Sequence, residues 1–190
     1  MQSSSQLSLL LWLSVISMCF SAGCNKDEIS AFHGDGALRY LPRPGIFGAD
    51  GYVLQFAPFA VSNAFSAQLT FSDIPVRKDP YWIYLVPDQK AMSLDFGEAS
   101  VSFSLSDGDG RLILSVTNKI ADWIESKYHI SPTVITREFR LARSKSDLES
   151  ASFMPKAGGR YMLSIAYEPS APLADSSGTA HFEIRRSAGK

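Results

Sequence analysis

The chain has 190 residues, of which 45% are hydrophobic and 19% are charged. This is the composition of a globular chain that buries a core, and the length fits one domain with or without a leader, so a disordered chain and a many-domain protein are excluded. Eighteen Lys and Arg against nineteen Asp and Glu give a formal charge of -1. No nucleic-acid partner is expected, because nucleic-acid binding favours a basic excess.

The chain begins with an uncharged leader. No Asp, Glu, Lys or Arg occurs before Lys26, and the run from Leu9 to Phe20 is nearly all apolar. This run has the length of the hydrophobic region of a signal peptide, and it is shorter than the roughly 20 residues that a membrane-spanning helix needs. Residues 1–23 are therefore predicted to be a signal peptide.

The end of the leader carries a short motif. Small residues at 21–23 (Ser, Ala, Gly) precede Cys24 and suit cleavage by a signal peptidase. The motif resembles the lipobox of bacterial lipoproteins, in which the cysteine after the cut is acylated. The resemblance implies that Cys24 begins the mature protein and holds it to a membrane of the bacterial cell envelope. Asn25 in place of an Asp favours the outer membrane, facing the periplasm.

An ordinary secretory signal cut after Gly23 is the alternative, and it predicts a secreted protein. The only cysteines are Cys19 and Cys24, and removal of the leader removes Cys19. A single unpaired thiol is unusual in a compartment where disulfides form, whereas an acylated cysteine needs no partner. The cysteine count therefore favours the lipoprotein.

After Cys24 the sequence predicts an irregular segment and then a β domain. Residues 24–50 are rich in Gly and Pro and show no sustained period, which is typical of a tether or an irregular arm. Residues 51–190 are predicted to form the folded domain. Its dominant signal is the alternation of apolar and polar residues, as in the runs 65–72, 101–106, 161–167 and 180–184.

Such alternation is typical of strands with one buried face. About eight strands joined by turns rich in Gly, Pro, Asp and Ser predict an all-β, antiparallel two-sheet sandwich, immunoglobulin-like or related. One interruption is expected to be helical. Within residues 118–129, Ile120, Trp123, Ile124 and Tyr128 recur at three- and four-residue spacing, which predicts one short amphipathic helix.

The last two predicted strands carry a second resemblance. "PKAGGRYMLSIAYEP", residues 155–169, followed by "GTAHFEIRR", residues 178–186, resembles the last two strands of immunoglobulin-like sandwiches. The resemblance implies a tyrosine corner, in which the hydroxyl of Tyr161 bonds back to the preceding turn. It concerns the fold and not the function.

"SDGDGR", residues 106–111, is the one stretch that suggests a metal site, because Asp107 and Asp109 offer oxygen ligands on a Gly-rich loop. Arg111 stands where the calcium-loop spacing needs another oxygen ligand. A hairpin turn, with Gly108 or Gly110 at positive φ, is the favoured interpretation. No histidine pair has a metal-ligand spacing, and no cofactor is expected.

The sequence favours a binding protein over an enzyme. It contains no G-x-S-x-G nucleophile motif, and its carboxylates are scattered along the chain. Two stretches are candidate binding sites. In "DPYWIYLVPD", Trp82 and Tyr84 form either a stacking platform for sugar rings or part of the core. In "TREFRLARSK", Arg137, Arg140 and Arg143 form either a solvated edge strand or a docking surface for an acidic partner or an anionic lipid headgroup.

Three functions are therefore compared. The first is a non-catalytic binding or assembly module for another protein of the envelope. The second is a glycan-binding module, which predicts that Trp82 or Tyr84 is exposed. The third is an inhibitor or immunity lipoprotein that binds a toxin or an enzyme through loops such as residues 168–178.

Overall fold

The structure is a computed structural model that describes residues 29–41, 51–131, 134–144 and 149–186. The predicted signal peptide and Cys24 lie outside these ranges. Within them, no helix is both long enough and apolar enough to cross a membrane.

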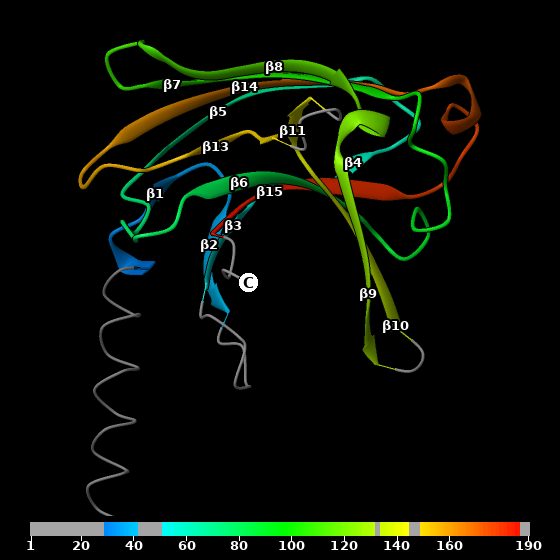
Figure 1. Cartoon of the computed structure of the whole chain (residues 1–190), viewed down its shortest axis with the longest axis horizontal. Coiled ribbons are helices and arrows are strands. Elements are labelled where there is room, and N and C mark those ends of the chain that lie inside the picture. Colours follow the sequence, from blue (N-terminus) through cyan, green and yellow to red (C-terminus); the bar gives the residue numbers. More distant parts are fainter. Residues whose placement is uncertain (1–28, 42–50, 132–133, 145–148, 187–190) are drawn as a thin grey trace, which may run out of the picture.

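Two antiparallel sheets stack to form a sandwich (Figure 1). The five-stranded sheet has the order β1 (His33–Gly34), β5 (Phe65–Ser72), β14 (Arg160–Glu168), β7 (Ser100–Asp107), β8 (Leu112–Lys119). The eight-stranded sheet has the order β2 (Ala37–Leu41), β3 (Gly51–Gln55), β15 (Thr179–Arg186), β6 (Tyr81–Pro87), β10 (Val134–Arg140), β9 (Ile124–Ser131), with β4 (Phe59–Ala60) beside β15 and β13 (Ser152–Phe153) beside β6. Strands β11 (Ala142–Ser144) and β12 (Glu149–Ser150) pair separately. The predicted all-β sandwich is confirmed.

The alternation in the sequence sets the two faces of each sheet. Leu163 in β14 lies opposite Leu69 in β5 and Leu105 in β7, and the serines next to these positions point outward. In the other sheet, Ile184 lies opposite Ile83 and is fully buried. The apolar faces of the two sheets meet and form one core, as period-2 alternation requires.

An aromatic cluster fills one part of this core. The Phe59 ring lies 4.6 Å from Phe65, 5.0 Å from Tyr167 and 5.4 Å from Phe182, measured between ring centroids. The Tyr167 hydroxyl donates a hydrogen bond to the Val61 carbonyl over 2.9 Å. Burial raises the pKa of Tyr167 to about 12, so this side chain is neutral at ordinary pH and acts as a packed aromatic with one satisfied hydroxyl.

The predicted tyrosine corner is present. The backbone N–H of Lys156 donates a hydrogen bond of 2.7 Å to the hydroxyl oxygen of Tyr161, which begins the buried face of β14. In the same turn, the Gly159 N–H donates a hydrogen bond to the Lys156 carbonyl. The hydroxyl therefore fixes the turn that leads into the central strand of the five-stranded sheet.

The helix predicted within residues 118–129 does not form. Strand β8 continues to Lys119, a 3-10 turn (η1) spans Ile120–Asp122, and β9 follows. Ile120 and Trp123 are buried as the spacing suggested, but they pack at a corner between two strands. Pairing of β9 with β10 outweighs the helical period, because a short amphipathic segment has little intrinsic helix stability.

Part of the predicted irregular arm belongs to the sandwich. Residues 29–41 contain β1 and β2, which pair with β5 and β3, so here the expectation of an irregular arm is corrected. Gly34 has a φ of 128°, and a Cβ at this position would lie 2.3 Å from the Thr70 carbonyl oxygen. Only glycine allows β1 to approach β5 so closely. Residues 42–50 lie outside the described ranges.

The connection between β14 and β15 crosses from one sheet to the other. A short 3-10 turn, η2 (Ala171–Leu173), follows β14 and precedes β15. Leu173 is fully buried there. Residues 168–178, considered above as a candidate binding loop, are thus partly pinned to the core.

Candidate functional site

Trp82 and Tyr84 both lie on the outer face of the eight-stranded sheet. They alternate with Ile83, whose side chain faces the core. Across the sheet, Trp82 is paired with Arg185 in β15, and Tyr84 is paired with Arg140 in β10. Two aromatic and two cationic side chains therefore come from three neighbouring strands and share one face.

Tyr84 is nearly buried although it lies on an outer face. Only 7% of it is exposed. The Arg185 guanidinium lies 3.9 Å from the centre of its ring, and Arg140 donates a hydrogen bond to its hydroxyl. Burial raises the pKa of Tyr84, and the nearby arginines offset part of that effect. Tyr84 is a covered part of this face and not an exposed platform.

Arg185 is held in a row of charged side chains. It forms ion pairs with Glu138 over 2.5 Å and with Glu183 over 3.0 Å, and Glu183 also contacts His181 over 2.8 Å. All four side chains are between 12% and 18% exposed. Burial alone would lower the pKa of Arg185, but the Glu138 and Glu183 carboxylates raise it, so its charge is retained and compensated.

Arg140 differs from Arg185 because no described residue pairs it with a carboxylate. It is half-buried, and its guanidinium lies 5.6 Å from the centre of the half-buried Trp82 ring. Its Nε is buried and has no hydrogen-bond partner in the described part of the chain. We call Trp82, Tyr84, Arg140 and Arg185 the Trp82–Arg140 surface. It presents a positioned cation beside an aromatic ring.

Arg137 is not part of this surface. Its side chain donates hydrogen bonds to the carbonyls of Met92 and Leu94 and forms an ion pair of 2.7 Å with Glu125. It also stacks on Phe139, with 4.6 Å between the guanidinium and the ring centre. Burial acts to raise the pKa of Glu125, but hydrogen bonds from Arg137 and Lys127 outweigh it and lower that pKa.

The predicted arginine cluster is therefore corrected. Arg137 holds the β6–β7 connection in place, and it is not available to a partner. Arg140 contributes to the Trp82–Arg140 surface. The backbone of Arg143 lies in β11, and its side chain is outside the described part of the structure.

The β7–β8 connection is a hairpin turn, as favoured from the sequence. One oxygen of Asp107 accepts hydrogen bonds from the N–H groups of Asp109, over 3.1 Å, and Arg111, over 2.9 Å. Gly110 has a φ of 79°, which suits glycine in such a turn. Asp107 thus stabilises the turn, and in the described ranges no group of three or more His, Cys, Asp and Glu side chains could hold a metal ion.

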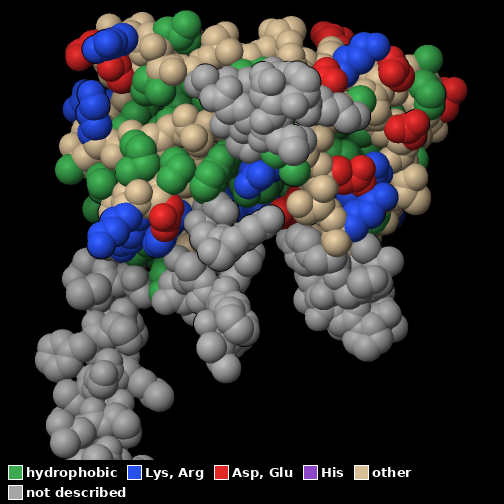
Figure 2. Space-filling view, in the orientation of Figure 1, with side chains coloured by type: hydrophobic (Ala, Val, Ile, Leu, Met, Phe, Trp, Pro, Cys, Tyr) green, Lys and Arg blue, Asp and Glu red, His purple; other side chains and the backbone are tan. Residues whose placement is uncertain are grey.

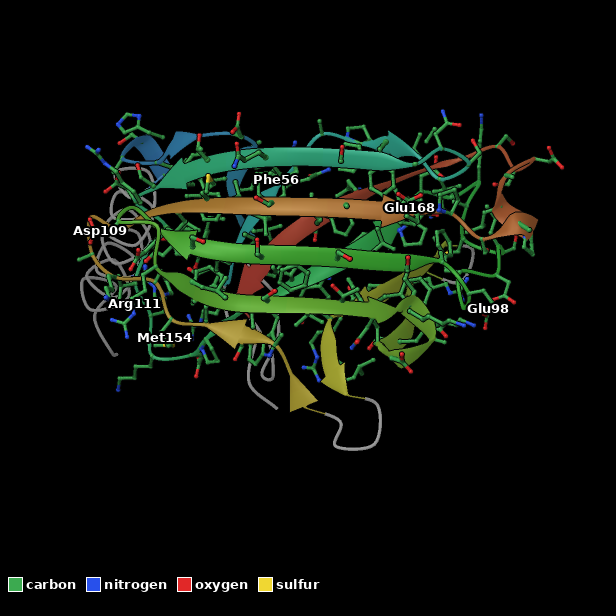
Figure 3. All side chains as sticks on the ribbon, turned by 90° about the horizontal axis from the view of Figure 1, so that it is seen from above. Phe56, Glu98, Asp109, Arg111, Met154 and Glu168 are labelled. Atoms are coloured by element: carbon green, nitrogen blue, oxygen red, sulfur yellow. The ribbon has the colours of Figure 1, made fainter. Side chains whose placement is uncertain are left out.

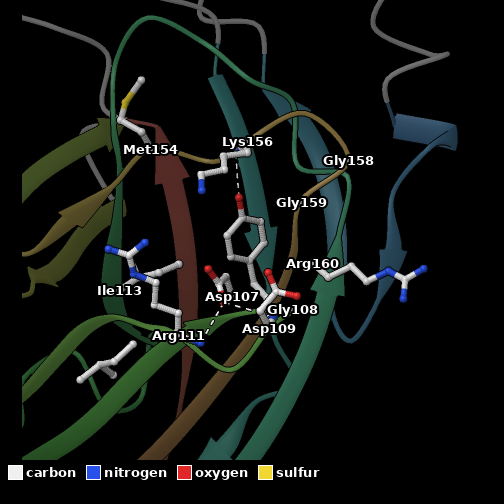
Figure 4. A pocket seen from close by; sticks show the side chains of 12 residues that line it. Asp107, Gly108, Asp109, Arg111, Ile113, Met154, Lys156, Gly158, Gly159 and Arg160 are labelled. Carbon is white, nitrogen blue, oxygen red and sulfur yellow. Dashed lines mark hydrogen bonds between the residues drawn. The ribbon is translucent and has the colours of Figure 1, made fainter.

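A hollow of about 670 Å³ lies beside this turn (Figure 4). The β7–β8 turn, the start of β8 and the β13–β14 loop line it. Its rim has three exposed hydrophobic side chains: Leu112 is 59% exposed, Ile113 is 39% and Met154 is 50%. Arg111, Lys156 and Arg160 add cations to the same hollow.

A break in the strand pairing explains the exposed leucine. Leu105 in β7 pairs with Leu114 in β8, but the next residue, Ser106, pairs with Leu112, so Ile113 is an extra residue. The bulge moves Leu112 from the inward face to the outward one, because the side-chain period is two. Alternation along the sequence would place Leu112 inward with Leu114, so the sequence by itself does not indicate these residues of the hollow.

The comparisons with known proteins are sparse. No protein-family model matches the chain. No curated protein matches it. One solved structure that resembles it is a carbohydrate-binding module specific for non-crystalline cellulose (CBM28), with a TM-score of 0.31 and 10% sequence identity over 80% of this chain and 83% of the other.

Proposed function

We propose that the protein is a lipid-anchored protein of the bacterial cell envelope, held by acylated Cys24. Its β-sandwich is a non-catalytic module that binds an envelope partner through the Trp82–Arg140 surface. The leader, its small residues at 21–23 and the cysteine count support the anchor. The absence of an Asp at position 25 favours the outer membrane, with the domain in the periplasm.

The state of Arg140 carries the proposed binding role. Its buried Nε lacks a hydrogen-bond partner among the described residues, and a buried donor without an acceptor costs about 1–3 kcal/mol. The Nε itself is covered, but Arg140 as a whole is only half-buried, so a carboxylate from a partner can contact the exposed part of its side chain and neutralise the cation. Tryptophan and arginine are also the residue types that most often dominate binding energies at protein interfaces. The proposed partner is therefore a protein that presents an acidic side chain or its C-terminal carboxylate.

The anchor is tested on bacteria that express the full chain. We expect mass spectrometry to find a mature N-terminal peptide that starts at Cys24 and carries diacylglycerol and an acyl chain. Inhibition of the lipoprotein signal peptidase should leave the leader uncut, and the Cys24→Ser variant should carry no lipid. An unmodified peptide that starts at Cys24 would refute the anchor and leave a secreted protein.

The binding role is tested by crosslinking in living cells followed by quantitative mass spectrometry of the captured proteins. Arg140→Gln should lower the recovery of the specific partner by about tenfold or more, as expected for a residue that dominates an interface. Lys90→Gln is the control, because Lys90 is an exposed cation on a loop outside this surface. Equal recovery with Arg140→Gln and with the unmodified chain would contradict the proposal.

The glycan-binding alternative is supported by one observation, the partial exposure of the Trp82 ring. It predicts retention on a polysaccharide column that Trp82→Ala abolishes and Arg140→Gln leaves unchanged, because sugar rings stack on the indole face. The opposite pattern, with no retention on polysaccharide and loss of partner on Arg140→Gln, supports the protein partner.

A further inference from the structure

The N-terminal segment joins the sandwich at a defined end. Strand β1 pairs His33 with Ser72, the last residue of β5, and Arg160 at the start of β14 also pairs with Ser72. A second hollow is lined by His33 and Arg160 together with Gly108 and Gly110 of the β7–β8 turn. We call this end, with the loops 73–80, 107–111 and 154–159, the β1 end.

The distance between the proposed anchor and the β1 end is short. Five residue steps separate Cys24 from Ile29, and an extended chain spans at most about 3.6 Å per residue, so the two lie within about 18 Å of each other. Ile29 and Phe32 already pack against the core. An acylated Cys24 therefore keeps the β1 end close to the bilayer surface.

The exposed hydrophobic side chains gather at this same end. Within the described ranges, the large hydrophobic residues with the most exposed surface are Val76, Leu112, Ile113 and Met154. Val76 lies in the β5–β6 connection, and the other three line the hollow beside the β7–β8 turn. A concentration of exposed apolar side chains at one end of a sandwich marks an interaction surface.

The charges along the molecule are also uneven. At the β1 end, Lys78, Arg111, Lys156 and Arg160 are exposed, and none of them forms an ion pair with a described residue. Most carboxylates at this end have partners: Asp35 accepts a hydrogen bond from the Thr70 N–H, Asp73 accepts one from Ser72, Asp79 pairs with Arg186, and Asp107 accepts the N–H groups of its turn. The exposed Asp109 is the carboxylate that faces the cations in the hollow.

The opposite end is acidic. Its loops and strand ends carry Asp88, Asp95, Glu98, Asp122, Glu168 and Asp175 against Lys90 and Lys119. Asp88 and Asp95 accept hydrogen bonds from backbone N–H groups, as Asp107 does at the β1 end. Lys119 is paired with Glu98 over 2.6 Å. Figure 3 shows Arg111 and Met154 at one end and Glu98 and Glu168 at the other. Figure 2 shows Lys and Arg beside hydrophobic side chains on the left of the molecule, together with some Asp and Glu, and it shows Asp and Glu interspersed with Lys and Arg on the right.

We propose that the β1 end docks onto an anionic phospholipid bilayer. Leu112, Ile113 and Met154 lie at the interface, and Arg111, Lys156 and Arg160 contact lipid phosphates. The inference rests on the proposed anchor, which brings this end to the membrane, and it adds a fixed orientation. The acidic end then points away from the bilayer, because an anionic surface repels it.

The orientation is tested on the mature protein purified from bacteria and reconstituted in two kinds of vesicle, phosphatidylcholine alone and phosphatidylcholine with phosphatidylglycerol. A fluorophore is placed through Met154→Cys or, as the control position, through Glu168→Cys. Lipids with a nitroxide headgroup quench fluorophores that lie at the surface. We expect strong quenching at position 154 in the anionic vesicles and little quenching at position 168.

Charge reversal provides the second measurement. The triple variant Arg111→Glu, Lys156→Glu and Arg160→Glu should abolish the quenching at position 154. One Lys or Arg near an anionic surface contributes about 1 kcal/mol, so the loss of each cation should lower the docked population about fivefold. The matched control reverses Lys90, Lys119 and Lys127, which changes the net charge equally. It should leave the quenching unchanged.

Two outcomes overturn the docking: equal quenching at both positions, or equal loss with both sets of reversals. The latter would show an effect of net charge alone. Flotation of the protein with phosphatidylcholine vesicles reports the anchor separately. A protein that does not float with them lacks the anchor, and its quenching on the anionic vesicles still decides the docking.

Discussion

Phe182→Ala lowers the free energy of unfolding by about 3–5 kcal/mol, the usual cost of removing a fully buried aromatic ring. Phe182 lies in the central strand β15 and is 2% exposed. Its ring stacks on Phe59 with 5.4 Å between centroids. Removing the ring leaves a cavity between the two sheets. Because β15 is hydrogen-bonded to a strand on each side, the sheet cannot move inward to fill that cavity.

The measurement is urea unfolding followed by circular dichroism, with a check that the slope against urea is unchanged. Phe65→Ala is the matched control, because Phe65 stacks in the same cluster but is only partly buried in β5. We expect it to cost less than half as much. A decrease in unfolding free energy of similar size in both variants would contradict the prediction, because it would show that the deeper burial of Phe182 does not make it more important than Phe65.

Removal of the Glu138 carboxylate is expected to cost about 2–4 kcal/mol, because it leaves Arg185 partly uncompensated in a largely buried position. Glu138→Leu is the variant of choice, since leucine keeps much of the side-chain volume. Glu183 remains as a second partner of Arg185, at 3.0 Å, and limits the loss. Urea unfolding of the purified domain gives the value.

A double-mutant cycle separates the pair from its surroundings. Arg185→Met alone leaves Glu138 without its guanidinium, whereas Glu138→Leu with Arg185→Met replaces the pair by apolar side chains. We expect the double variant to be more stable than either single variant, with a coupling of about 0.5–3 kcal/mol. Additive losses would show that the 2.5 Å contact between Glu138 and Arg185 does not stabilise the fold.

The same network explains why the Trp82–Arg140 surface could be anticipated only in part. Trp82 and Tyr84 stand out in the sequence as aromatic residues in a strand without a polar face. Their strand β6 is an interior strand of the sheet, between β15 and β10. Nothing local to residues 81–87 indicates that Arg185, about a hundred residues later, covers the Tyr84 ring.

The arginines of residues 137–143 show the same limit. Adjacent residues of a strand point to opposite faces, so residues three apart, such as Arg137 and Arg140, are predicted to lie on opposite faces, and they do. Arg137 is buried because the β6–β7 connection folds over it and offers its carbonyls. That connection is distant in sequence, so the difference between a structural arginine and an available one is a tertiary property.

The sequence alone determined the features that depend on neighbouring residues. Alternation along 65–72, 101–106 and 161–167 predicted strands and their buried faces, because adjacent side chains of a strand must point in opposite directions. The tyrosine corner at Tyr161 and the hairpin turn at Asp107 were predictable for the same reason, since their hydrogen bonds close within five residues.

The tertiary structure decided everything that depends on distant partners. Residues 124–131 became a strand because β10 was available to pair with them, and Leu112 became exposed because a bulge shifted its register against β7. The β1 end gathers four segments that are separated in the chain, and only the folded sheets place their hydrophobic and cationic side chains together. A periodic pattern determines which way a side chain points, whereas strand pairing determines what it meets there.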